Sequence, residues 1–98
     1  MKLTHEENRV VISLEGDFVT DLVNEFRNVI QEQIQAGHTA FVLDFKNTVI
    51  IDSMGIGCLV ATFNTLKQKN GTLELINVPE NLKDVFQVMR LDRILTIN

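Results

Sequence analysis

Few side chains in this sequence are of the types that catalyse reactions or bind metal ions. His5 and His38 are the only histidines, Cys58 is the only cysteine, and Asp44 and Asp52 could imitate a catalytic carboxylate pair. An enzyme brings such groups together, as a nucleophile beside a base or as a set of metal ligands. Neither histidine lies in a ligand-spaced cluster, the two aspartates bracket a predicted loop, and no phosphate-loop, zinc-protease or hydrolase motif is present. The sequence therefore predicts a protein that is not an enzyme and that holds no metal or other cofactor.

Cys58 lies in a predicted helix between Gly57 and Leu59. The start of a helix can make a thiol reactive. A lone cysteine among small and apolar neighbours is more often a packing residue. We therefore expect Cys58 to pack within the fold.

Ser53 is the remaining side chain in a chemically suggestive position. It follows Asp52 at the predicted junction between a loop and a helix. One interpretation is an N-cap, because a serine hydroxyl often accepts an amide hydrogen bond at a helix start. The other is a phosphorylation site, since a phosphate there would face free amides and the positive end of the helix dipole. Spacing alone leaves both interpretations open.

Gly55 and Gly57 fall in the first turns of the same predicted helix. Glycine costs about 1 kcal/mol at a helical position, so two of them there need a reason. We expect a close approach at these positions, either between the helix and its own sheet or between the helix and a partner.

Apolar residues alternate in some segments, which predicts strands, and recur at helical spacing in others, which predicts helices. The two kinds of segment alternate along the chain. The expected strands are residues 3–5, 10–14, 39–43, 72–76 and 94–97. The first helix is expected to begin at Thr20 or Asp21 and to end at Gly37, and the third to begin near Pro79. The order β-β-α-β-α-β-α, with a possible final strand, predicts one α/β domain over residues 1–98, with three helices on a mixed, mostly parallel sheet of four to five strands. The side chains expected in its core are Leu14, Phe41, Leu43, Leu59, Phe63, Leu73 and Phe86.

Composition narrows the classes of partner. The chain has 98 residues and a formal net charge of -4, which disfavours nucleic acid and anionic membrane surfaces as partners. One cysteine permits no internal disulfide, and no apolar run is long enough to span a membrane. We expect a cytoplasmic protein that is monomeric when free.

Several segments resemble the STAS domain family, in the form of the bacterial anti-sigma factor antagonists. Residues 51–57 resemble that family's loop-to-helix signature, in which Asp and Ser precede a hydroxyl residue, Gly, Leu or Ile, and Gly. Residues 42–45 resemble the strand before the signature, and residues 14–18, 77–79 and 91–94 resemble further family segments. The resemblance covers almost the whole chain and implies the STAS fold.

The resemblance implies an anti-sigma factor antagonist that exchanges partners. Its unmodified form would bind an anti-sigma factor, which is a serine kinase, and so free the sigma factor. The kinase would phosphorylate Ser53 and release the antagonist, and a PP2C-type serine phosphatase would restore it. The residues implied in partner binding are Asp17, Asp52, Ser53, Met54, Gly55, Ile56 and Gly57.

Three positions depart from the family pattern. Met54 stands where a second hydroxyl residue is usual, Val19 stands where a second acid is expected, and the chain ends at Asn98 where many members continue into another helix.

Two competing hypotheses about function remain. One is a STAS binding subunit of a lipid-transport or stress-signalling assembly that has no phosphorylation switch. The other is a small enzyme that uses Asp44, Asp52 or Cys58.

Overall fold

The computed structural model describes residues 1–98, and its elements follow the order expected from the sequence. The elements are β1 (Lys2–Glu6), β2 (Arg9–Ser13), α1 (Thr20–Gln35), β3 (Ala40–Asp44), α2 (Ser53–Gln68), β4 (Thr72–Ile76), α3 (Glu80–Val88), the 3-10 helix η1 (Leu91–Arg93) and β5 (Thr96–Ile97). The final strand is shorter than expected, with two residues. No helix is both long and apolar enough to cross a membrane.

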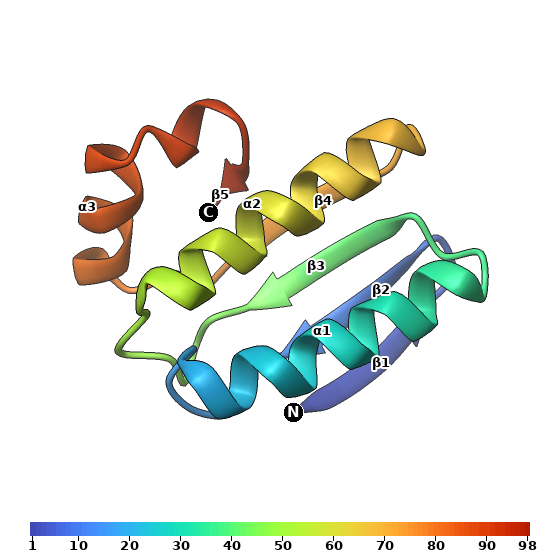
Figure 1. Cartoon of the computed structure of the whole chain (residues 1–98), viewed down its shortest axis with the longest axis horizontal. Coiled ribbons are helices and arrows are strands. Elements are labelled where there is room, and N and C mark those ends of the chain that lie inside the picture. The colour runs from blue at the N-terminus through green and yellow to red at the C-terminus, as the bar shows by residue number, and fades with distance from the viewer.

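The five strands form one mixed sheet in which strand order equals chain order, β1-β2-β3-β4-β5. β1 pairs antiparallel with β2, and each later neighbour pairs in parallel. Parallel neighbours need a crossover, and right-handed crossovers that always advance by one strand put every connecting helix on the same face. Figure 1 shows α1 and α2 side by side over the sheet, with α3 beyond α2. The predicted fold class is confirmed.

The core lies between this helix layer and the sheet. It contains four aromatic rings in edge contact, with centroid distances of 5.4 Å for Phe18–Phe26, 6.2 Å for Phe18–Phe45 and 6.1 Å for Phe45–Phe86. Edge-to-face contacts of this kind are favourable because the positive ring edge meets the negative ring face. These rings join the loops after β2 and β3 to α1 and α3, which fixes the edge of the sheet where the loops meet.

Six of the seven side chains expected in the core are buried, and the expectation for Phe63 is wrong. Phe63 is half-buried and packs at the margin of the core. The buried face of α2 is centred on Leu59, Thr62 and Leu66, which recur at helical spacing. Phe63 follows Thr62 and therefore lies on the flank of this face.

The sheet face opposite the helices is covered by polar side chains. Strand residues alternate between faces, so Val42 points away from the helices and is still only 3% exposed. Arg9 Nη1 lies 4.0 Å from Glu74 Oε1, and the Asn98 amide donates to Glu74 Oε2 at 2.6 Å. The hydrogen bond from Arg9 to Glu6 raises the pKa of the arginine. The middle of β3 is therefore buried on both faces, while Ala40 and Asp44 at its ends are only partly buried, and the far face is covered by polar side chains and not by a helix.

Candidate functional site

Ser53 lies at the edge of the sheet where the parallel strands end. The carboxyl ends of β2, β3 and β4 meet at this edge, and α2 begins there with Ser53 as its first residue. In open α/β sheets this edge commonly carries the binding site, because its loops vary while the sheet beneath stays rigid. The segments that form it here are residues 14–19, 45–52 and 77–79.

Asp52, and not Ser53, caps α2. The Asp52 backbone is extended, and its Oδ1 accepts a hydrogen bond of 2.9 Å from the amide of Gly55. The interpretation of Ser53 as the N-cap is therefore wrong. Ser53 is exposed, and its hydroxyl makes no hydrogen bond within the chain. A carboxylate at this position also suits the positive end of the helix dipole.

Two backbone amides at the start of α2 remain without acceptors. Gly55 N–H donates to the Asp52 side chain, and Ile56 N–H donates to the Asp52 carbonyl at 3.0 Å. The amides of Ser53 and Met54 have no partner in the chain. The first amides of a helix are free unless a cap or a ligand meets them. An anionic group on the Ser53 side chain would lie beside these two donors.

Gly55 lets the start of α2 pack closely against neighbouring loop residues. A Cβ at this position would lie 2.5 Å from the Phe18 carbonyl oxygen and 2.8 Å from Cγ1 of Ile51. Phe18 and Ile51 also form a parallel bridge, in which Phe18 N–H donates to the Ile50 carbonyl. Gly55 is buried, so the close approach here is to the chain's own loop. The expectation of a partner contact at Gly55 is corrected accordingly.

Gly57 differs from Gly55 in its surroundings. A Cβ at Gly57 would meet nothing within 4 Å, and the residue is exposed. Ile56, between them, is half-buried against the core. Gly57 therefore leaves helix backbone exposed on the surface, about one turn after Ser53.

Asp17 shapes the loop before Ser53. Its Oδ1 accepts hydrogen bonds from the amides of Val49, at 3.2 Å, and Ile50, at 3.1 Å. The buried hydroxyl of Thr48 donates to the Gly16 carbonyl at 2.9 Å. Sequence reasoning assigned Asp17 to partner contact and missed this internal role, since nothing local links a residue to amides 32 positions away.

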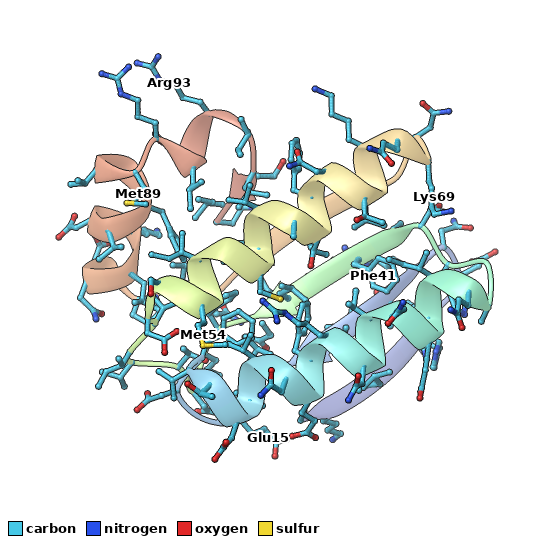
Figure 2. The ribbon with its side chains drawn as sticks, viewed as in Figure 1. Glu15, Phe41, Met54, Lys69, Met89 and Arg93 are labelled. Atoms are coloured by element: carbon cyan, nitrogen blue, oxygen red, sulfur yellow. The ribbon has the colours of Figure 1, made fainter.

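The loop and the start of α2 present an apolar rim, of which the sequence predicted Met54 and missed two loop residues. Val49 is 62% exposed, Ile50 is 55% exposed and Met54 is 38% exposed. Figure 2 shows Met54 at the start of α2, facing the start of α1, where the Thr20 hydroxyl lies 3.7 Å from its sulfur. The sequence feature that could have revealed these loop residues is the apolar run directly before Asp52 and Ser53, which lies outside any predicted strand. We name Val49, Ile50 and Met54 the apolar rim.

The structure places the other chemical candidates in separate surroundings. Asp44 Oδ1 accepts hydrogen bonds from the Lys46 amide and from the Asn77 side chain, so it holds two loops together. Cys58 is 2% exposed, as expected for a packing residue. His5 and His38 do lie together, with ring centroids 5.2 Å apart, which their separation in sequence concealed. No third metal-binding side chain joins them.

Comparison with known proteins identifies a matching family and solved structures of the same fold. The STAS domain family model matches residues 1–98. No curated protein sequence matches. TM1081 of Thermotoga maritima, described as a candidate anti-sigma factor antagonist, has a TM-score of 0.93 and 18% identity, over 98% of this chain and 83% of that one. Bacillus SpoIIAA in its phosphorylated form has a TM-score of 0.79 and 24% identity, over 99% of this chain and 89% of that one.

The anti-sigma factor antagonist SpoIIAA in its unphosphorylated form has a TM-score of 0.75 and 24% identity, over 95% of this chain and 96% of that one. At such identities the structural likeness establishes the fold alone, while the family match spans the entire chain. The chain belongs to the STAS domain family, and it has the fold of the anti-sigma factor antagonists.

Proposed function

We propose that this chain is an anti-sigma factor antagonist whose partner binding is switched by phosphorylation of Ser53. The unmodified domain binds an anti-sigma factor that is a serine kinase, and this frees the sigma factor. The kinase then phosphorylates Ser53, the complex dissociates, and a PP2C-type phosphatase regenerates the binding form. The domain takes part as a binding protein and not as an enzyme.

The observation that carries the proposal is the state of the Ser53 hydroxyl. It is exposed, it makes no hydrogen bond within the chain, and the capping role that could occupy it belongs to Asp52. A kinase can therefore reach it without disturbing a structural contact. The position of the hydroxyl at the loop edge also lets a partner approach it without meeting the sheet.

The expected effect of the phosphate differs between the free domain and the complex. In the free domain, its charge of about -1.5 to -2 lies beside the free amides of Ser53 and Met54 and the positive end of the helix dipole. In a complex that covers the apolar rim, the same charge loses its water, which is costly unless a cation replaces it. Asp52 adds a like charge close by. The modification therefore weakens binding and leaves the fold in place.

The partner surface in this proposal is centred on the apolar rim. Met54 and the two loop residues provide its apolar contact, and Gly57 lets a partner approach the helix backbone. Asp17 holds the loop in shape and presents its second carboxylate oxygen, which accepts no bond within the chain. Met54, which replaces the usual hydroxyl residue, makes this surface more apolar.

The structural neighbours are consistent with the proposal. SpoIIAA has been solved in phosphorylated and unphosphorylated forms, and both superimpose on this chain over nearly its whole length. A fold of this type thus accommodates a phosphate.

The test uses an anti-sigma factor kinase from the same genome, ATP and the full chain. Intact-mass spectrometry should show the addition of one phosphate to wild-type protein and none to Ser53→Ala. The matched control is Ser13→Ala, which removes the only other serine and should still be modified. Calorimetric titration should then show tight binding of the kinase to unmodified protein and weak binding to the phosphorylated form. Equal affinity for the two forms would contradict the switch and favour a STAS binding subunit without one.

A further inference from the structure

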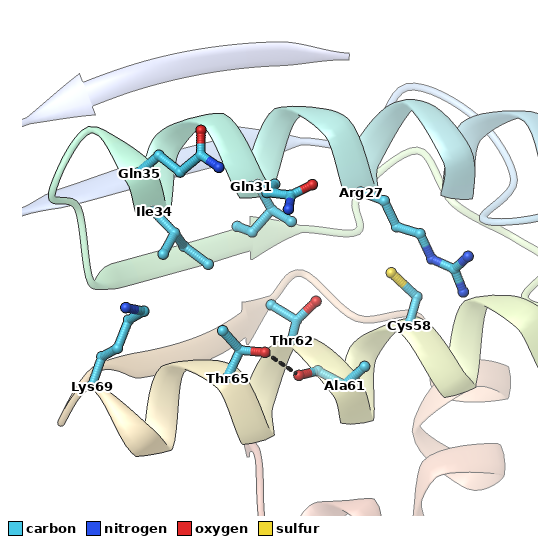
Figure 3. Close-up of a pocket in the computed structure, with 10 residues that line it drawn as sticks. Arg27, Gln31, Ile34, Gln35, Cys58, Ala61, Thr62, Thr65 and Lys69 are labelled. Carbon is cyan, nitrogen blue, oxygen red and sulfur yellow. Dashed lines mark hydrogen bonds between the residues drawn. The ribbon is translucent and has the colours of Figure 1, made fainter.

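A groove runs along the seam between α1 and α2 and has a volume of about 600 Å³. It exists because the side of α2 that faces α1 carries small side chains, among them Cys58, Ala61 and Thr65. Figure 3 shows these side chains opposite longer ones from α1, with open space between the two helices. The volume falls in the range of ~300–1,000 Å³ that is usual for ligand sites.

The floor of the groove is apolar except for one hydroxyl. Ile30 is 6% exposed, Cys58 is 2% exposed and Thr62 is 6% exposed. The Thr65 hydroxyl donates to the Ala61 carbonyl at 3.0 Å, whereas the Thr62 hydroxyl has no hydrogen-bond partner in the chain. No buried side-chain oxygen or nitrogen of the chain lacks a partner, so the Thr62 hydroxyl is open to the groove. The groove therefore presents a free hydroxyl to which a ligand could bind.

The two ends of the groove are positively charged. Arg27 lies at one end and Lys69 at the other (Figure 3). Neither takes part in any of the three ion pairs of the chain, and no carboxylate lines the groove. α2 contains no acidic residue, although the net charge of the whole chain is -4. The groove is thus a local cationic site on an acidic protein.

The length of the groove suits an extended chain. The lining residues from α2 and its C-cap run from Cys58 to Lys69. At 1.5 Å per residue this span is about 16 Å. An extended peptide covers that distance with about five residues, at ~3.3 Å each. An acidic residue at each end of such a segment would lie near one of the two cations.

We propose that the α1–α2 groove binds an extended acidic segment of a partner protein. Aliphatic side chains of the segment lie on the floor, one of its carbonyl oxygens accepts a hydrogen bond from Thr62, and its carboxylates lie near Arg27 and Lys69. A fatty acid of similar length would leave Thr62 without an acceptor and one of the cations without a partner. The site does not include Ser53, so the proposal stands apart from the phosphorylation switch.

The test begins with selection from a random twelve-residue peptide library on the intact chain. The expected peptides carry aliphatic residues flanked by Asp or Glu about five positions apart. The strongest binder is then synthesised and titrated by calorimetry, and amide chemical shifts report where it binds. We expect shifts confined to the groove and equal affinity for unmodified and Ser53-phosphorylated protein.

Variants of the chain decide the role of each feature. Arg27→Gln with Lys69→Gln should weaken the peptide about tenfold, because two charge pairs are lost. The matched control, Lys67→Gln with Arg93→Gln, removes two cations outside the groove and should change affinity less than twofold. Thr62→Val should weaken binding severalfold, and Thr62→Ser, which keeps the hydroxyl, should restore it.

Three results would overturn the proposal. The first is selection of peptides without acidic residues. The second is an equal loss of affinity in the two double variants. The third is binding of dodecanoate in the groove, seen by the same chemical shifts, while the selected peptides bind elsewhere. The last result would assign the groove to a long-chain carboxylate.

Discussion

Asp52 and Ser53 are adjacent in the chain but have different structural roles. Asp52 satisfies the Gly55 amide and fixes where α2 begins, and this leaves the Ser53 hydroxyl without a structural role. Both residue types are common N-caps, so the sequence could not distinguish them. Only the backbone conformation, which is extended at Asp52, shows which residue lies before the first turn.

The different roles of Asp52 and Ser53 should appear as different effects on the free energy of unfolding. Asp52→Ala should lower the free energy of unfolding by about 1 kcal/mol, because the Gly55 amide loses its acceptor. Ser53→Ala should change it by less than about 0.5 kcal/mol, as expected for an exposed side chain without a hydrogen bond. Urea unfolding of both variants provides the comparison. If Ser53→Ala proved the more damaging, the capping assignment would be wrong.

The two glycines of the signature should also respond in opposite ways. Gly55→Ala places a methyl group against the Phe18 carbonyl and should cost about 1–3 kcal/mol through overpacking. Gly57→Ala meets open space and should stabilise the helix by up to about 1 kcal/mol. Denaturant melts give both values. Under the proposed function, Gly57→Ala should also weaken kinase binding while raising stability, a combination that an unfolding defect cannot produce.

At the scale of elements, the loop before α2 is held by side chains from other parts of the chain. Asp17 holds two of its amides, and the Asn81 side chain, from α3, donates to the Val49 carbonyl at 2.8 Å. These contacts turn an irregular segment into a shaped surface that carries the apolar rim. They are few and lie near the surface, so this segment depends on each of them.

Asp17→Ala should loosen this loop without unfolding the domain. The amides of Val49 and Ile50 lose their shared acceptor, and their hydrogen exchange should accelerate at least severalfold. The control is Asp21→Ala, which removes an exposed acid from the first turn of α1 that forms no hydrogen bond or ion pair. Exchange measured by NMR on both variants tests the assignment. Unchanged exchange at both amides in Asp17→Ala would mean that other contacts hold the loop.

Sequence patterns predicted the elements well because those depend on near neighbours. Alternating apolar residues gave β2, helical spacing gave α1, and Gly37, with a φ of +100°, follows the end of α1 as expected. The site depended on contacts between distant positions. Asp17 with Val49 is one such contact, and the close approach of Gly55 to Phe18 is another. The error at Phe63 has a local cause, since one helical position separates a buried side chain from a flanking one.

At the scale of the whole molecule, the site lies at one edge of the sheet, away from the core between the sheet and the helices. The core contacts of the sheet do not include Ser53, and the apolar rim lies outside the core. A charge added at this edge therefore changes the surface while the packing between helices and sheet stays as it was. This separation is what a binding switch in so small a domain requires.

Phosphorylated protein should melt close to the unmodified protein. We expect a difference in Tm of less than about 4 °C, which corresponds to less than ~1 kcal/mol for a domain of this size. Calorimetric melts of the two forms, with Ser53→Asp as a third sample, would measure it. A larger fall in Tm would show that the phosphate disrupts α2, and the loss of binding would then follow from unfolding.

The chain-ordered sheet also bears on how the protein folds. Each strand pairs only with strands adjacent to it in the sequence, so the sheet can assemble progressively from the β1–β2 hairpin, without closing a long loop before any contact forms. The bonds of Asp17 to residues 49 and 50 connect positions on opposite sides of a complete crossover, and they require β2, α1 and β3 to be in place. The loop before α2 is therefore expected to acquire its native shape late in folding, after the strands and the helix that support it.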